Sequence, residues 1–327
     1  MIAIGSMGGT IAMAPGGAGE GLSPTLGAAE LIAAVPQLAD LGPITTGAIC
    51  NVGSPSVMFD DALAAHAWAG DQVAAGARGV VLTHGTDTLE ETAYLLDLLW
   101  EHDAPLVLTG AMRAPDDPGA DGPANLLAAA LVAGAERARG LGVLLVMNDE
   151  VFLAARVRKT HSFAVDAFAA PWGTAIGRVI EGALEIDWLP AAARAAALPR
   201  PDAAPRVAVL EAGIGDDGVA FEAVSRAVDG LVIAGVGAGH VSATAADVLD
   251  DVLTRIPVVM ATRTGGGRTG RNTYGYAGAE IDLMRRGVVM AGHLTPAQAR
   301  LLLWVLLGQG ADREAIAAQF EARGARA

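Results

Sequence analysis

The sequence predicts an α/β protein with a larger N-terminal domain, built on a doubly wound and mostly parallel sheet, and a smaller C-terminal α/β domain. Short apolar runs of β type alternate with longer helix-type segments in two consecutive series. Continuous apolar strands separated by helices indicate a parallel sheet that is covered on both faces. A proline-rich stretch divides the two series, and this break predicts two domains.

The expected elements follow the chain in order. In the first series the strands are residues 2–4, 80–83, 106–109 and 143–147, with helices at 89–100 and 126–137. In the second series the strands are 207–210, 231–235 and 258–261, with helices at 221–228 and 245–255. The last expected helix is 296–307.

The proposed domain boundary lies in an alanine-rich stretch with four prolines, which are Pro190, Pro199, Pro201 and Pro205. Proline fixes φ and lacks an amide hydrogen, so four of them cannot lie inside one regular element. We therefore predict an N-terminal domain at 1–187, a linker at 188–205 and a C-terminal domain at 206–327.

Composition narrows the class of protein. The 327 residues are 52% hydrophobic and 18% charged, which is enough to bury a large core. A net charge of −14 argues against nucleic-acid binding, which depends on Lys and Arg. No uncharged apolar run reaches the roughly 18 residues that a membrane helix needs, and the chain start lacks a secretory pattern. We expect a cytoplasmic protein, and the single Cys50 excludes an internal disulfide.

Ligands of open parallel sheets bind beyond the carboxyl ends of the strands, so the loops that follow strands are the candidate sites. The first is Gly8-Gly9-Thr10-Ile11. Two glycines allow a tight turn with free N–H groups, and Thr10 would present its hydroxyl at the strand end. The alternative is a plain glycine turn. A phosphate loop is excluded, because the Gly-Lys-Ser/Thr element is absent.

The second loop is the most informative, and it reads Thr83-His84-Gly85-Thr86-Asp87-Thr88-Leu89-Glu90-Glu91-Thr92-Ala93. Thr88 and Glu91 fit a helix capping box. Capping accounts for Thr88, but it does not require His84, Thr86 and Asp87 as well. We interpret His84 as a brace for the loop rather than as a proton-transfer group.

The third loop contains Arg156-Val-Arg-Lys159-Thr160-His161. A lysine in such a place is usually a solvated surface charge. Lys159 has a chemical role only if the sheet brings it close to Thr86 and Asp87, because a lysine beside a threonine lowers the cost of removing a proton.

These motifs together resemble the bacterial L-asparaginase and glutaminase-asparaginase family. The resemblance rests on the two threonine loops and on Val-Met-Asn-Asp-Glu followed by Arg-Lys-Thr. It continues through residues 33–37, 109–113, 121–123, 235–239 and 279–282, and so covers nearly the whole chain.

The resemblance implies specific roles for the catalytic residues. Thr10 resembles the threonine that attacks the amide carbon and forms an acyl-enzyme. Thr86 resembles the second catalytic threonine, with Asp87 and Lys159 beside it. Backbone N–H groups of Gly9 and Gly85 and their loops are candidate oxyanion donors, because a threonine hydroxyl needs both an activating neighbour and charge stabilisation.

The resemblance also implies how substrate is held. Asp87 would bind the α-amino group, and Ser54 the α-carboxylate, with Ser56 as the alternative. The carbonyl of Ala111 would meet the amide nitrogen. Glu280 matches an acidic residue that reaches the site of a neighbouring subunit, which implies a homodimer or a homotetramer.

Several positions depart from the family pattern. Residues 12–24 contain no tyrosine, although relatives carry one in this glycine-rich lid. Tyr274 and Tyr276 are interpreted as ordinary loop packing, with a role at a site as the alternative. Pro55 replaces a frequent glutamine, and His240 replaces an asparagine that contacts substrate from the partner subunit.

The leading hypothesis is hydrolysis of L-asparagine to L-aspartate and ammonia, with no cofactor, metal, nucleic acid or membrane partner. Alternatives are a glutaminase or another hydrolase of small ω-amides, a transfer-RNA amidotransferase subunit, and a weakly active amino-acid-binding relative. A dinucleotide enzyme is a further alternative, suggested by the glycines of 235–239, but a lone glycine pattern is a weak signal.

Overall fold

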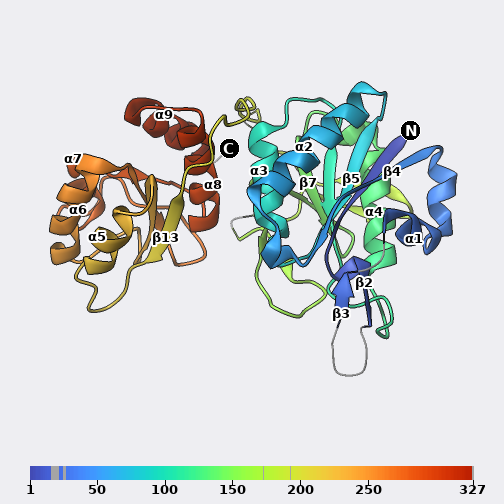
Figure 1. Ribbon diagram of the computed structural model, residues 1–327, viewed down its shortest axis with the longest axis horizontal. Coiled ribbons are helices and arrows are strands. Elements are labelled where there is room, and N and C mark those ends of the chain that lie inside the picture. The colour runs from blue at the N-terminus through green and yellow to red at the C-terminus, as the bar shows by residue number, and fades with distance from the viewer. Residues whose placement is uncertain (16–21, 25–26, 172, 192, 326–327) are drawn as a thin grey trace. The chain divides into compact units, whose positions relative to one another are not determined.

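The computed structural model describes residues 1–15, 22–24, 27–171, 173–191 and 193–325. It forms two compact units, Met1–Ala197 and Leu198–Ala327 (Figure 1). Both units are α/β, with a large and mostly parallel sheet in the first and a smaller parallel sheet in the second, so the predicted fold class is confirmed. The linker at 188–205 stays a prediction.

The sheet of the first unit has eight strands in the order β12-β11-β8-β7-β6-β5-β1-β4. Five of them run parallel: β4 (Ile44–Val52), β1 (Ile2–Gly8), β5 (Gly79–Thr83), β6 (Leu106–Thr109) and β7 (Val143–Met147). Three antiparallel strands extend it: β8 (Glu150–Leu153), β11 (Gly177–Ile180) and β12 (Ala183–Ile186). The chain runs from β1 to β4 on one side and then to β5 on the other, so the strand order reverses at β1 and β5.

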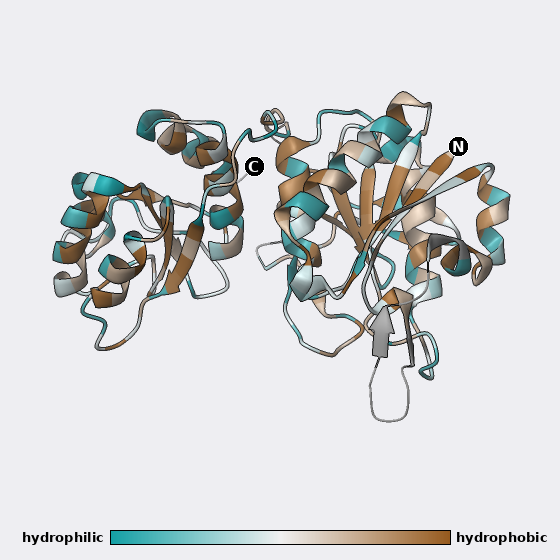
Figure 2. Ribbon diagram, viewed as in Figure 1, coloured by the Kyte–Doolittle hydropathy of each residue, from teal (hydrophilic) through white to brown (hydrophobic). Residues whose placement is uncertain are grey.

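Helices cover both faces of this sheet. Apolar clusters join α2 (Phe59–Ala74) and α3 (Leu89–Leu99) to one face, and α1 (Ala28–Ala33) and α4 (Gly122–Ala133) to the other. Alternate residues of β1 enter opposite clusters, Ala3 on the α2 side and Ile4 on the α4 side. Figure 2 shows the resulting pattern, with hydrophobic strands enclosed by helices whose outer faces are hydrophilic.

A tryptophan of α2 packs directly on the backbone of the sheet. A Cβ added to Gly5 would lie 2.7 Å from the ring of Trp68, and one added to Gly47 would lie 2.6 Å from it. Glycine is therefore required at both positions, on β1 and β4, for this helix to approach.

Two short antiparallel pairs lie outside the main sheet. One joins β2 (Met13–Pro15) to β3 (Leu22–Pro24), and the other joins β9 (Arg158–Lys159) to β10 (Phe168–Ala169). Four short 3-10 helices complete the described part of the unit: η1 (Thr10–Ala12), η2 (Pro36–Leu41), η3 (Ser54–Ser56) and η4 (Glu136–Ala138). Residues 16–21, in the centre of the predicted lid, lie outside the described residues.

The second unit is a parallel four-stranded sheet of β13 (Val207–Glu211), β14 (Gly230–Gly235), β15 (Val258–Thr262) and β16 (Val289–Met290). One apolar cluster joins it to α5 (Val219–Ser225), α6 (Ala243–Arg255) and α7 (Glu280–Arg286). The strands also pack on α8 (Pro296–Gly308), which contacts α9 (Arg313–Gly324). The expectation that the helix at 296–307 is the last one is therefore wrong. Among the described helices, none is long and apolar enough to cross a membrane.

Candidate active site

The loops after β1 and β5 meet at the edge where the strand order reverses. Gly9 has φ of 86°, which favours glycine, and its backbone lies against that of Gly85. A Cβ on Gly9 would fall 2.2 Å from the amide nitrogen of Gly85, and a Cβ on Gly85 would fall 2.7 Å from Ser54 Oγ. The segments that contain Gly9, Gly85 and Ser54 therefore lie closer together than larger residues at the two glycine positions would allow. Half-buried Thr10 follows directly, at the start of η1.

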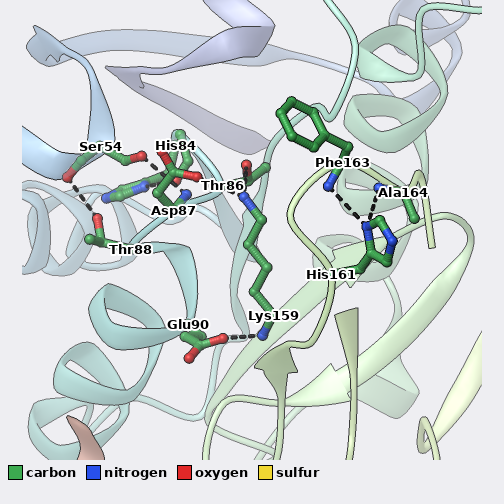
Figure 3. Close-up of polar contacts among 11 residues, drawn as sticks. Ser54, His84, Thr86, Asp87, Thr88, Glu90, Lys159, His161, Phe163 and Ala164 are labelled. Carbon is green, nitrogen blue, oxygen red and sulfur yellow. Dashed lines mark hydrogen bonds and ion pairs between the residues drawn. The ribbon is translucent and has the colours of Figure 1, made fainter. Parts of the chain in front are cut away.

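Lys159 reaches this edge from β9. Its Nζ donates to Thr86 Oγ1 at 2.9 Å and to Asp87 Oδ1 at 2.7 Å (Figure 3). The Lys159 side chain is 13% exposed, whereas that of Asp87 is 60% exposed, so the amine is sheltered and the carboxylate faces outward. Lys159 thus lies close to Thr86 and Asp87, which is the condition for a chemical role of its amine.

Lys159 is also the only lysine of the chain, whose other strongly basic side chains are arginines. Arginine stays protonated at any accessible pH, whereas a lysine amine can release a proton. A sole lysine placed against a threonine hydroxyl fits a role that needs an amine and not only a positive charge. This count was available from the sequence and would have singled out Lys159 before the fold was known.

Glu90 is a further residue of the site that the sequence reasoning did not single out. Its carboxylate accepts the backbone N–H of Lys159, which holds β9 beside α3 (Figure 3). Burial raises the pKa of Glu90 to about 7, against the opposing effect of that hydrogen bond and of the nearby Arg158 and Lys159.

Ser54 joins η3 to the threonine loop. Its Oγ accepts the N–H of Asp87 at 3.1 Å, and its backbone carbonyl accepts the Thr88 hydroxyl at 2.8 Å. The capping box predicted for Thr88 is wrong, because Thr88 occupies the N-cap position but makes no side-chain cap. Its hydroxyl binds the Ser54 loop instead. Ser54 is buried, whereas Pro55 and Ser56 are exposed.

His84 braces this loop from beneath, as we interpreted it from the sequence. It is fully buried, with Nδ1 2.7 Å from the Gly85 carbonyl and Nε2 3.0 Å from the Thr92 hydroxyl. A carbonyl only accepts, so Nδ1 carries the hydrogen and Nε2 accepts from Thr92. Burial lowers the pKa of His84 to about 4, although the bond to Gly85 opposes the shift, so the ring is neutral.

This burial predicts a pH-dependent contribution of His84 to stability. Its pKa is depressed on folding, so only the unfolded state takes up the proton between pH 6.5 and about 4. The contribution is complete above pH 6.5, and about 3 kcal/mol of it is lost as the pH falls to 4. The pKa of Glu90 is raised on folding, so its contribution to the free energy of unfolding increases, rather than decreases, as the pH falls from about 7.

The comparison of wild type with His84→Asn isolates the His84 contribution, because Glu90 is common to both. We expect urea unfolding to show that the wild type has the larger free energy of unfolding at pH 7, and that its difference from the variant decreases steadily down to pH 4.5. A gap that stays constant over this range would mean that His84 does not titrate differently in the folded protein.

Ala111 lies in a loop that α4 holds in place. Asp121 accepts the backbone N–H groups of Met112 and Arg113 at 2.9–3.1 Å, and Asn125 Nδ2 donates to the Gly110 carbonyl at 3.0 Å. A Cβ on Gly110 would lie 3.2 Å from the Thr86 methyl group, so this loop borders the same edge. Residues four apart on a helix share a face, and this spacing could have identified the Asp121–Asn125 pair from the sequence.

His240 and Glu280 form a separate cluster in the second unit. The Glu280 carboxylate is fully buried and accepts the N–H groups of Thr273 and Tyr274, each at 2.7 Å, and His240 Nε2 at 2.9 Å. Burial opposes ionisation, but these hydrogen bonds hold the pKa of Glu280 below its usual value. Among the described residues, no three His, Cys, Asp or Glu side chains form a group suited to a metal ion.

The fold and these contacts define a class: a two-unit α/β protein with a threonine, lysine and aspartate cluster beyond the carboxyl ends of a doubly wound sheet. Residues 1–192 match the model of the N-terminal domain of asparaginase, and residues 206–320 match that of the glutaminase/asparaginase C-terminal domain. The chain belongs to the asparaginase family.

Individual relatives agree with this membership. The chain is 39% identical to a probable L-asparaginase of Deinococcus radiodurans, over 94% of this chain and 93% of that protein. It is 35% identical to a probable periplasmic L-asparaginase of Haemophilus influenzae, over 89% and 83%. The crystal structure of a probable cytoplasmic L-asparaginase from Campylobacter jejuni aligns with a TM-score of 0.86 at 34% identity, over 98% of both chains.

Proposed function

We propose that this protein hydrolyses L-asparagine to L-aspartate and ammonia through a threonine nucleophile. The observation that carries the proposal is the Lys159 amine, bonded to both Thr86 and Asp87, in a member of the asparaginase family. Hydrolysis of L-glutamine is the second candidate function, because residues 206–320 match a C-terminal domain described for both glutaminases and asparaginases.

In the proposed reaction the Thr10 hydroxyl attacks the side-chain amide carbon. The new C–O bond forms, the hydroxyl proton is transferred to the leaving nitrogen, and ammonia departs to leave an acyl ester on Thr10. Water then hydrolyses the ester to aspartate and free Thr10. Backbone N–H groups of the Gly9 and Gly85 loops would stabilise the negative charge on the carbonyl oxygen in both steps.

Thr86 and Lys159 would act as a pair in moving protons. Because Nζ donates to Thr86 Oγ1, the hydrogen of the Thr86 hydroxyl is turned away from the amine. That hydroxyl can then pass its own proton to a water or to the substrate while Lys159 releases a proton to Thr86 Oγ1, and the transfers run in reverse to restore the pair.

The substrate would be held by its charged backbone groups. The exposed carboxylate of Asp87 would pair with the α-ammonium group. Ser54 Oγ already accepts the N–H of Asp87, so its own hydrogen is available to donate to the α-carboxylate. The Ala111 carbonyl would receive the amide nitrogen.

The two serines of η3 allow a matched test of carboxylate binding. A hydrogen bond to a charged group contributes about 1.5–3 kcal/mol, so Ser54→Ala should raise KM for asparagine by about 10- to 100-fold. Ser56→Ala, two residues away and exposed, should leave KM unchanged. Steady-state kinetics of both variants decide between them, and a larger effect of Ser56→Ala would reverse the assignment.

We also propose that the chain forms a homodimer or homotetramer, in which His240, Glu280 and the Pro55 position contribute to substrate binding as the family resemblance implies. An isologous dimer would contain two equivalent sites. A role in asparagine catabolism and a cytoplasmic location are proposed on the same basis. The descriptions of the matching relatives include both probable cytoplasmic and probable periplasmic enzymes.

The proposal is tested by ammonia release from L-asparagine and L-glutamine, with wild type, Thr10→Ala and Thr86→Ala. We expect turnover of asparagine by the wild type and its loss in both variants. If the wild type hydrolyses neither amide but binds asparagine, the protein is an amino-acid-binding relative and the proposal is wrong. If glutamine is the better substrate by kcat/KM, the second candidate replaces the first.

A further inference from the structure

Lys159 lies on a strand that is itself held weakly. β9 has two residues and forms a two-stranded sheet with β10, in which Lys159 pairs with Phe168 and Arg158 with Ala169. A two-stranded ribbon is at best marginally stable by itself. The position of the Lys159 amine therefore depends on what else holds this strand.

One short segment holds both ends of Lys159. At the end of the side chain, Nζ donates to Thr86 Oγ1 at 2.9 Å and to Asp87 Oδ1 at 2.7 Å. At the other end, the backbone N–H donates to the Glu90 carboxylate. Figure 3 shows the lysine side chain extended between these partners. Because residues 86–90 are consecutive, the segment that presents the Thr86 hydroxyl also fixes the backbone from which the lysine extends.

Helix α3 makes Glu90 a rigid point of attachment. Glu90 lies in the first turn of this helix. The adjacent Leu89 and, three residues further on, Ala93 are fully buried in the apolar cluster that joins α3 to the sheet. A side chain on a packed helix is placed more precisely than one on a loop. Glu90 therefore transfers the rigidity of α3 to the backbone of β9.

The charge of Glu90 strengthens this attachment. A hydrogen bond to an ionised carboxylate is roughly twice as strong as one between neutral groups. Burial raises the pKa of Glu90 to about 7, and the charge of Glu91 raises it further, whereas the Lys159 N–H bond and the charges of Arg158 and Lys159 lower it. The carboxylate takes up a proton as the pH falls through about 7, and its bond to the Lys159 N–H then weakens.

We propose that Glu90 is a positioning residue for the reaction: its carboxylate fixes the backbone of Lys159, so that the amine stays within hydrogen-bond distance of Thr86 and Asp87. This inference rests on the proposed function, in which that amine moves protons with Thr86. Glu90 acts through Lys159 rather than on the substrate. A displacement of about 1 Å can cost about 100-fold in rate, so a residue that only holds Lys159 still affects turnover strongly.

The sole lysine allows this attachment to be observed directly. Protein labelled with α-¹⁵N-lysine has one labelled backbone amide, that of Lys159, because no other lysine occurs in the chain. A strong hydrogen bond to a carboxylate moves an amide proton resonance downfield in the NMR spectrum. We expect the Lys159 resonance of the wild type to lie downfield at pH 8 and to move upfield as the pH is lowered to 6. A resonance that does not move overturns the inference.

The Glu90→Gln variant assigns that titration. Glutamine keeps an oxygen that can accept the Lys159 N–H, but its amide does not ionise in this range. The Lys159 resonance of this variant should therefore stay constant between pH 8 and pH 6. A titration that persists in Glu90→Gln comes from another group, such as His161 two residues along the chain, and it also overturns the inference.

Ammonia release measures the effect on turnover, in variants whose folding is confirmed by circular dichroism. Glu90→Met removes the acceptor and should lower kcat roughly 100-fold, as for a misplaced reacting group. Glu90→Gln keeps the bond but loses its charge, so its kcat should lie within about tenfold of wild type. Both losses should appear mainly in kcat, because Glu90 makes no proposed contact with substrate. Glu91→Met removes the neighbouring carboxylate of the same turn and should stay within about twofold of wild type.

The outcomes separate this inference from the proposed function. If the wild type is active and Glu90→Met keeps its kcat, or loses no more than Glu91→Met, the inference is wrong and the proposed function stands. If Glu90→Met does not fold, the titrations of wild type and Glu90→Gln decide. A wild type that releases ammonia from neither amide overturns the proposed function and the role of Glu90 in turnover, whereas the Lys159 resonance separately reports the attachment.

Discussion

Replacing Lys159 by methionine is expected to lower kcat for asparagine by about a thousandfold, within the range found for loss of an acid–base group. Methionine keeps much of the side-chain volume but removes the amine that donates to Thr86 and Asp87. The Thr86 hydroxyl would lose its proton-transfer partner, and the Asp87 carboxylate would lose its fixed counter-charge. KM should rise as well, because Asp87 is the proposed site of the α-ammonium group. Initial rates of ammonia release over a range of asparagine concentrations measure both parameters.

The Lys159→Arg variant distinguishes proton transfer from charge alone. Arginine supplies the positive charge but does not release its proton. We expect Lys159→Arg to be nearly as slow as Lys159→Met in kcat, with KM closer to that of wild type. Restored turnover in the arginine variant would contradict a role for the amine in moving protons.

The sole lysine makes a chemical form of the same test possible in the unmodified chain. Reductive methylation would modify only Lys159 and the terminal amine, because there is no other lysine. The fractional change in the residual rate of Lys159→Arg, treated in the same way, reports any effect of the terminal amine. Loss of activity in the wild type alone is the expected result, with saturating asparagine protecting Lys159 during the reaction.

Thr10→Val is expected to remove turnover to the limit of detection, because valine has the shape of threonine without the hydroxyl that would form the ester. Thr10→Ser keeps a hydroxyl at the same turn beside Gly9 and should retain a measurable fraction of kcat. Asparagine binding by isothermal calorimetry should persist in Thr10→Val, since the proposed amine and carboxylate contacts are untouched. Turnover by Thr10→Val comparable to wild type would contradict the nucleophile assignment.

The parts of the fold that the sequence predicted well are those with uninterrupted apolar runs. The central strands β5, β6 and β7 are buried on both faces, and their sequences are therefore continuous apolar runs that predict buried strands. The edge strand β4, Ile44–Val52, was missed because its residues alternate between half-buried and exposed and include polar side chains. Helix α9 was missed for a similar reason, since only Ile316, Phe320 and Gly324 of it are buried.

The candidate site was predictable where a motif joined chemistry to position. Thr86, Asp87 and the strand end beneath them are consecutive in sequence, and the family resemblance pointed to Lys159. The contact between Lys159 and Thr86 depends on the pairing of β9 with β10 and on the Glu90 bond to the Lys159 backbone. Neither of these has a local sequence signal.

The capping box shows why a correct pattern gave a wrong contact. Thr88 does lie at the N-cap of α3, as the pattern indicated, but a nearby carbonyl of Ser54 competes for its hydroxyl. That carbonyl comes from η3, more than 30 residues earlier in the chain. Long-range packing of this kind decides between partners that a local pattern treats as equal.

Detection of the acyl-enzyme tests directly whether Thr10 is the nucleophile. Wild-type protein would be mixed with asparagine, quenched in acid within the first turnover, and mapped by peptide mass spectrometry, with Thr10→Val treated in parallel. We expect an aspartyl group on Thr10 of the wild type and none in the variant. Ammonia release without any adduct on Thr10, or an adduct on Thr86 in its place, would contradict it.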